Sequence, residues 1–268
     1  MLSTRHTPRS RDRTLGYAFI ILIILQSYLV PLIAIAAGSD YNRYVDYSYI
    51  YVISSYALIV FSIVYFHDKG LDVFQDHFSL WTIILTCFFR VSLGGANEIY
   101  YKGALIFLGI VLLNYTITHR NDIRVPTLKS ILIGLVWSVG TVVVISLLQA
   151  LLSPASNTAP SNLLTYVMQK TAFQLSFVTV IEESCFRGLL VGFLVMNGHK
   201  ENTALLIQAI FFWGIHYMRI ADPVFFFLII PLFTLSATIL IKKSRAIFLS
   251  IMMHTFSNVL ESILVALL

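Results

Sequence analysis

Charged residues are scarce in this sequence, and their scarcity excludes an ordinary soluble domain. Only 12% of the 268 residues are Asp, Glu, Lys or Arg, whereas 58% are hydrophobic. In soluble domains about 25% of the residues are charged and about 45–50% are apolar. The 13 glycines and 7 prolines are too few for a fibrous or disordered chain, and two cysteines, Cys87 and Cys185, cannot form a disulfide framework. What remains is a protein that crosses a membrane several times.

Apolar runs long enough to cross a bilayer recur along the whole sequence. A bilayer core about 30 Å thick needs about 20 apolar residues per helix, and we count eight or nine such runs. The sequence therefore predicts an all-α transmembrane bundle, with about five spans in residues 1–152 and a second part in residues 163–268. The predicted spans are 15–37, 47–66, 78–93, 103–118, 128–152, 163–196, 204–220, 223–241 and 246–268. The run 163–196 is too long for one perpendicular crossing.

Basic residues near the ends of the apolar runs predict the orientation of the bundle. The N-terminus is expected to be cytoplasmic, as are the basic segments at 120–129 and 242–245, while the uncharged segment 153–162 is expected outside. The four arginines before the first span are Arg5, Arg9, Arg11 and Arg13. The first span is expected to be retained rather than cleaved as a signal peptide. Because the net charge of +5 is dispersed in short clusters, no nucleic-acid partner is expected.

Ionisable residues inside the apolar runs are the most informative feature, because a charge at a helix centre costs roughly 2.5–3.5 kcal/mol on insertion scales. Glu182, Glu183 and Arg187 lie within one long apolar segment. Glu183 and Arg187 are four residues apart, in the order that favours an ion pair, while Glu182 is turned about 100° away on a helix. One glutamate is therefore expected to pair with the arginine and the other to be free for proton transfer.

Two histidines occur in the apolar runs that follow. His216 lies one helical turn after Phe212, and His254 lies one turn before Asn258. Each polar residue also has a purely structural interpretation. A histidine can be a hydrogen-bonded packing residue, a Glu-Arg pair can lock two helices together, and an asparagine can bond across helices.

Helix geometry nevertheless predicts that these groups meet. At 1.5 Å per residue, an antiparallel hairpin places Glu183 and His216 at nearly the same depth in the membrane. For straight, untilted helices, His254 would lie roughly 9 Å shallower than His216. Tilt, or a broken helix near Gly188 and Gly192, has to absorb that difference.

The order of these polar residues resembles the three motifs of the CPBP family, the CAAX protease and bacteriocin-processing proteins, also called the type II CAAX prenyl endopeptidase or Abi family. The motifs are EExxxR, FxxxH and HxxxN, and the matching residues here are Glu182, Glu183, Arg187, Phe212, His216, His254 and Asn258. The resemblance covers about residues 163–268, which correspond to the four-helix core of the family. It implies an intramembrane protease whose catalytic core is the second part of the chain.

The residue types suit peptide hydrolysis, which needs a base to activate water, an acid for the leaving amine and donors to the oxyanion. We assign Glu182 as the base, since an unpaired carboxylate in an apolar site is suited to proton transfer. The other predicted roles are water holding by His216, oxyanion donation by His254 and Asn258, and support of the base by Glu183 with Arg187.

A metal centre is the alternative mechanism. Two histidines and a glutamate can ligate zinc and leave a fourth position open, in which case Glu183 becomes the candidate base, although the sequence contains no HExxH motif. We favour a glutamate mechanism that uses no cofactor. Cys185 has no neighbouring histidine in the sequence and is expected to pack between helices rather than to act as a nucleophile.

Three hypotheses of function follow. The first is an endopeptidase of the bacterial plasma membrane that processes bacteriocin precursors or signal peptides, or gives self-immunity to a bacteriocin. The second is a non-proteolytic membrane scaffold or regulator of the same family. The third is a proton-coupled transporter with a buried Glu-His-His relay, which the odd span count and the lack of an internal repeat disfavour. The expected partners are a peptide or membrane-protein substrate and the lipid bilayer; no oligomeric state is indicated.

Overall fold

The computed structural model describes residues 10–37, 41–66, 69, 71, 76–93, 99–152 and 162–267. Secondary structure within these ranges is helical, apart from an isolated bridge between Asp76 and Arg124. The prediction of an all-α fold is therefore confirmed. The predicted features at Arg5, Arg9 and residues 153–161 lie outside the described residues.

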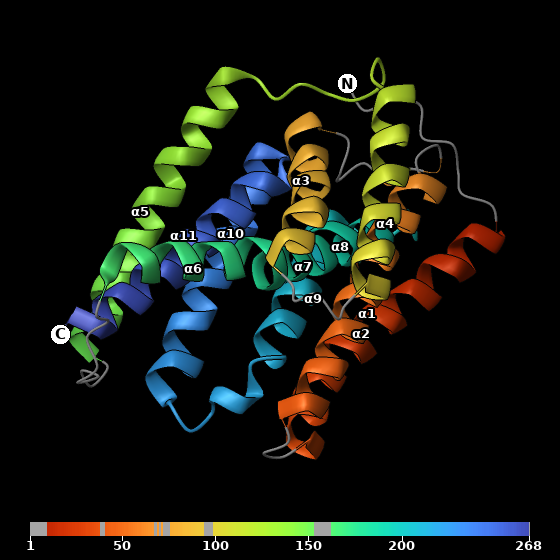
Figure 1. Ribbon diagram of the computed structural model, residues 1–268. Helices are drawn as coiled ribbons and strands as arrows, with labels where there is room; N and C mark the ends of the chain where they lie inside the picture. The colour runs from red at the N-terminus through yellow and green to blue at the C-terminus, as the bar shows by residue number, and fades with distance from the viewer. Residues whose placement is uncertain are drawn as a thin grey trace.

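The N-terminal part consists of five long helices (Figure 1). They are α1 (Ser10–Ala37), α2 (Tyr41–Phe66), α3 (His77–Leu93), α4 (Ile99–Thr118) and α5 (Leu128–Leu152). Each overlaps a predicted span, and α5 has the predicted bounds. Side chains such as Val136 and Leu147 of α5 are exposed on the outer side of the bundle, which is the environment that apolar residues find in a bilayer.

The C-terminal part begins with one bent run of helix through the middle of the bundle (Figure 1). The predicted run 163–196 is helical throughout, as expected, and two π-helical segments interrupt its α-helical hydrogen bonding. The run comprises α6 (Leu163–Phe173), η3 (Gln174–Val178), α7 (Thr179–Glu182), η4 (Glu183–Leu190) and α8 (Val191–Met196), where η3 and η4 are π-helical. The chain continues with α9 (Glu201–Gly214), the 3₁₀ turn η5 (Tyr217–Arg219), the π-helical η6 (Phe225–Ile229), α10 (Ile230–Ser244) and α11 (Ile247–Leu267).

The predicted span 204–220 also needs correction, because α9 ends at Gly214 and His216 lies in the turn that follows. Tyr28 of α1 packs against this helix end. A Cβ atom on Gly214 would collide with the Tyr28 hydroxyl, and the rings of Tyr28 and Tyr217 stack with centroids 6.3 Å apart. Glycine leaves room for the Tyr28 hydroxyl at this position. The apolar sequence continues past the turn and gives no sign that the helix ends there.

Both parts of the chain contribute to one apolar core. Phe193 of α8 packs against Phe19 of α1 and Phe66 of α2, with ring centroids 5.5 and 5.0 Å apart. The Tyr56 hydroxyl of α2 donates to the backbone carbonyl of Ser176, at 3.3 Å. The N-terminal helices therefore support the bent run that carries the first motif.

The described helices include enough long apolar segments for a multi-pass membrane protein. Five of them meet the length and hydropathy that a crossing requires, and a shorter apolar helix spans His77–Phe89. The five segments are Tyr49–Phe66, Tyr100–Thr118, Leu128–Gln149, Phe225–Ser244 and Ile247–Leu264.

One end of the bundle is held together by polar contacts between loops, and we call it the basic end: residues 10–13, 76–77, 119–129, 197–201 and 242–247. Asp76 caps α3 by accepting from the backbone N–H and the hydroxyl of Ser79, at 2.9 and 2.6 Å. Burial raises the pKa of Asp76. The Arg124 guanidinium donates to the backbone carbonyl of Arg245, whose own guanidinium pairs with Glu201 at 2.9 Å.

Candidate active site

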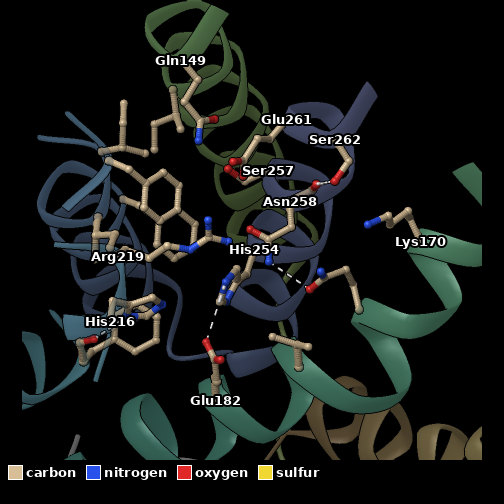
Figure 2. Close-up of a pocket in the computed structure, with 18 residues that line it drawn as sticks. Gln149, Lys170, Glu182, His216, Arg219, His254, Ser257, Asn258, Glu261 and Ser262 are labelled. Carbon is tan, nitrogen blue, oxygen red and sulfur yellow. Dashed lines mark hydrogen bonds and ion pairs between the residues drawn. The ribbon is translucent and has the colours of Figure 1, made fainter. Parts of the chain in front are cut away.

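A pocket of about 310 Å³ lies among the C-terminal helices and is lined by Glu182, His216, His254 and Asn258. Figure 2 shows Glu182 and His254 facing one another across it. The three sequence motifs, which are separated by tens of residues, therefore meet around one cavity. A second group of polar residues lines the pocket farther from Glu182 and forms what we call the mouth: Gln149, Lys170, Arg219, Glu261 and Ser262.

The buried ion pair expected from the first motif is present. Arg187 Nη1 lies 2.5 Å from Glu183 Oε1, and both side chains are fully buried. The two residues lie in η4, and π-helical turns of this kind are rare and are found frequently at functional sites. These turns bend the run that carries the glutamates. The 9 Å offset expected for His254 is absent, since its Nδ1 lies 2.8 Å from Glu183 Oε1.

Glu183 accepts hydrogen bonds from donors on two elements. Its carboxylate accepts hydrogen bonds from Arg187 of η4 and from two residues one turn apart on α11, Ser250 and His254. A fully buried carboxylate is tolerated only when it is paired and hydrogen-bonded in this way. Glu183 therefore joins η4 to α11, and it is not among the residues that line the pocket.

Aromatic rings complete the surroundings of Arg187. The guanidinium carbon lies 4.2 Å from the ring centroid of Phe212 and 5.5 Å from that of Phe233, within the range of cation–π attraction. Phe212 is itself buried and also contacts the His216 ring, with centroids 4.9 Å apart. The phenylalanine of the second motif thus links the ion pair to the histidine.

Hydrogen bonds fix the tautomers of both histidines. His254 Nδ1 contacts an acceptor-only carboxylate, and His216 Nδ1 contacts the backbone carbonyl of Phe212 at 2.8 Å. Because neither partner can donate, each Nδ1 carries a proton. The Nε2 atom of each ring is therefore the one left for chemistry in the pocket, and in the neutral imidazole it is an acceptor.

Glu182 has a different environment from Glu183. Its side chain is 20% exposed, and Oε2 is buried without a hydrogen bond from any residue that the structure describes. The nearest ring atom is His254 Nε2, at 3.9 Å, which is too far for a direct hydrogen bond. One water that donates bonds of about 2.8 Å to two acceptors separates them by roughly 4.4 Å, so this gap is close to the size that such a water needs.

Asn258 is one turn beyond His254 and donates from Nδ2 to Gln174 Oε1, at 2.9 Å. An amide nitrogen carries two protons, so one remains for a ligand.

The sequence analysis did not identify two supporting residues of the site, Ser250 and Gln174. Ser250 could have been found from its spacing, since it lies one turn before His254 on the same helix face. Nothing in the sequence pattern indicates a role for Gln174.

The donor types in the pocket suit zinc, but their placement does not. Among the residues that the structure describes, no group of three His, Cys, Asp or Glu side chains could hold a metal ion. Glu183, the base in the zinc alternative, is engaged by three donors. The reaction proposed below therefore has no metal-dependent step.

A bundle of membrane helices that collects a free carboxylate, two histidines and an amide in one pocket has the parts of an intramembrane hydrolase. Residues 163–260 match the family described as Type II CAAX prenyl endopeptidase Rce1-like, which supports membership of this C-terminal segment in the CPBP family. The match confirms the resemblance drawn from the motifs. No curated protein and no solved structure matches the chain. The family is one of CAAX-type proteases, which supports endopeptidase activity in general.

Replacing His254 by asparagine tests which ring nitrogen takes part in the reaction. The Asn Nδ2 atom takes the place of His Nδ1 and can still donate to Glu183, but nothing replaces Nε2. We expect cleavage to fall by about 100-fold or more, while the melting temperature in detergent stays near that of the wild type. His254→Ala removes both nitrogens and should lower the melting temperature as well. Wild-type turnover in His254→Asn would exclude Nε2 from the reaction.

Proposed function

We propose that this protein is an intramembrane endopeptidase in which Glu182 activates the attacking water. The observation that carries this proposal is the difference between the adjacent glutamates. Glu183 accepts hydrogen bonds from Arg187, Ser250 and His254, whereas Glu182 faces the pocket with a carboxylate oxygen 3.9 Å from His254 Nε2. One carboxylate is structural, and the other is available to take a proton.

In the first step, a water held between Glu182 Oε2 and His254 Nε2 attacks the carbonyl carbon of the scissile peptide bond. The water proton moves to Glu182, a new C–O bond forms, and the carbonyl π electrons move to oxygen. His216 Nε2 is the further acceptor for orienting the water. The oxyanion accepts from the second N–H of Asn258, since Nε2 of an imidazole that is protonated only at Nδ1 is an acceptor.

In the second step, protonated Glu182 donates its proton to the nitrogen of the leaving amine. The C–N bond breaks as the carbonyl re-forms, and the products are a carboxylic acid and an amine. Glu182 thus returns to the carboxylate and serves as base and acid in turn. His254 would donate to the oxyanion only with a second proton at Nε2, since its Nδ1 proton is directed to Glu183.

The biological role that we propose is in the bacterial plasma membrane. There the enzyme processes bacteriocin precursors or signal peptides, or gives self-immunity to a bacteriocin. The substrate is a peptide or a membrane protein that reaches the pocket from within or beside the lipid bilayer.

Comparative peptidomics tests the activity and the substrate class together. Cells that carry wild-type protein are compared with cells that carry Glu182→Gln at equal abundance. We expect at least one membrane-derived peptide to accumulate uncleaved, and its fragments to disappear, in the variant. Identical peptide profiles together with a preserved cellular phenotype would favour the non-proteolytic scaffold instead.

A further inference from the structure

The basic end of the bundle collects loops that are far apart in the sequence. Arg124, which precedes α5, contacts the backbone of Arg245 between α10 and α11, and Arg245 reaches Glu201 at the start of α9. Lys69 pairs with Asp12 of α1 at 3.7 Å. Further basic residues at this end lie in the first or last turns of these helices or in the loops that join them: Arg11, Arg13, Arg120, Lys129, Lys200, Lys242 and Lys243.

The pocket mouth lies at the opposite end. Gln149 is near the last residue of α5, Arg219 is in the turn after α9, and Glu261 is near the last residue of α11. Because α5, α9 and α11 all begin at the basic end and run away from it, all three residues lie at the far end of the bundle. In Figure 1, α5 and α11 run together toward the end where the C-terminus lies.

The path from the pocket to the basic end is closed. Glu182 is separated from that end by residues 183–196, which span about 20 Å at helical rise. Apolar residues one to two turns inside the basic end are almost fully buried on η4, α9, α10 and α11: Leu190, Leu205, Leu240 and Ile251. At the other end, Arg219 is exposed and Glu261 is partly exposed. A ligand therefore enters from the mouth and not through the basic end.

We propose that the site takes its peptide from the extracytoplasmic side of the membrane. The positive-inside rule assigns the basic end to the cytoplasm, and the mouth opens at the opposite end of the same helices. This inference rests on the proposed function and narrows its substrate class. The substrate is a peptide segment of an exported or membrane-inserted protein that is exposed at the outer surface, not a peptide presented by the cytoplasm.

Cysteine labelling with a membrane-impermeant maleimide tests the orientation and the opening. Ala221 is exposed beside the mouth, Ser262 lines the mouth, and Lys243 is exposed at the basic end. The native cysteines, Cys87 and Cys185, are buried, so the wild-type chain is the unlabelled control. We expect Ala221→Cys and Ser262→Cys to label in right-side-out spheroplasts. Lys243→Cys should label only in inverted membrane vesicles.

Labelling of Ala221→Cys only in inverted vesicles would overturn the orientation. Labelling of Ser262→Cys only from the side that labels Lys243→Cys would overturn the opening. Neither readout requires cleavage, so failure of the peptidase proposal would leave the labelling pattern unchanged. Reversed labelling, in turn, would leave the chemistry intact and assign it a cytoplasmic substrate.

Discussion

Glu182→Gln is expected to lower the turnover of the purified protein by about 10²- to 10⁴-fold, the range that a general base or acid contributes. Glutamine has nearly the same size, but it cannot take the proton of the attacking water or return one to the leaving amine. The substitution should leave folding unaffected, because Glu182 Oε2 receives no hydrogen bond from the described residues and the side chain is partly exposed.

The comparison needs a second exchange of carboxylate for amide away from the pocket. Glu201→Gln supplies it, since Glu201 pairs with Arg245 at the basic end and should retain turnover within a few-fold of the wild type. Cleavage of a peptide found by peptidomics is followed by mass spectrometry at matched protein concentration. Near wild-type turnover in Glu182→Gln would remove Glu182 as the base.

The same variant tests the zinc alternative. If zinc were held by Glu182 and the two histidines, Glu182→Gln would lower the zinc content of protein purified without chelator, and chelation would inactivate the wild type. The glutamate mechanism predicts instead that wild-type turnover survives chelation. Elemental analysis of both proteins, beside a chelator titration, decides between these outcomes.

The sequence predicted most of the fold because the membrane imposes a simple rule on it. Any segment in lipid has to satisfy its own backbone, so long apolar runs become helices, and the bounds of α5 were predicted to the residue. The rule does not specify where an apolar run bends. Hydropathy did not reveal the π-helical η3 and η4. It also did not reveal the end of α9 at Gly214, where Tyr28 packs against the helix.

The candidate site was predictable to the extent that its groups repeat at helical spacing. Glu183 and Arg187 form the expected pair, and His254 and Asn258 line the same pocket one turn apart. Which ring nitrogen of each histidine faces the pocket was not predictable. It depends on contacts between elements, above all the bond from His254 Nδ1 to Glu183, which turns Nε2 toward Glu182.

Arg187→Ala should have the largest effect on stability. It leaves the fully buried Glu183 without its counter-ion, and breaking a buried pair in this way costs about 3–5 kcal/mol. The remaining donors to its carboxylate are Ser250 and His254. The truncation also removes the guanidinium from the face of Phe212. We expect lower abundance in the membrane, a lower melting temperature in detergent and loss of activity.

A double variant separates the missing charge from the missing contacts. In Glu183→Gln with Arg187→Met, the amide oxygen can accept from His254 while the amide nitrogen donates to the Ser250 hydroxyl, and methionine packs on Phe212. Because replacing a buried ion pair by neutral groups of similar volume is often tolerated, the double variant should recover most of the melting temperature lost in Arg187→Ala. If the double variant were as unstable as Arg187→Ala, the loss would come from packing around residue 187. If Arg187→Ala kept the wild-type melting temperature, Glu183 would not depend on the arginine for its place in the core, and its role as the support of Glu182 would have to be abandoned.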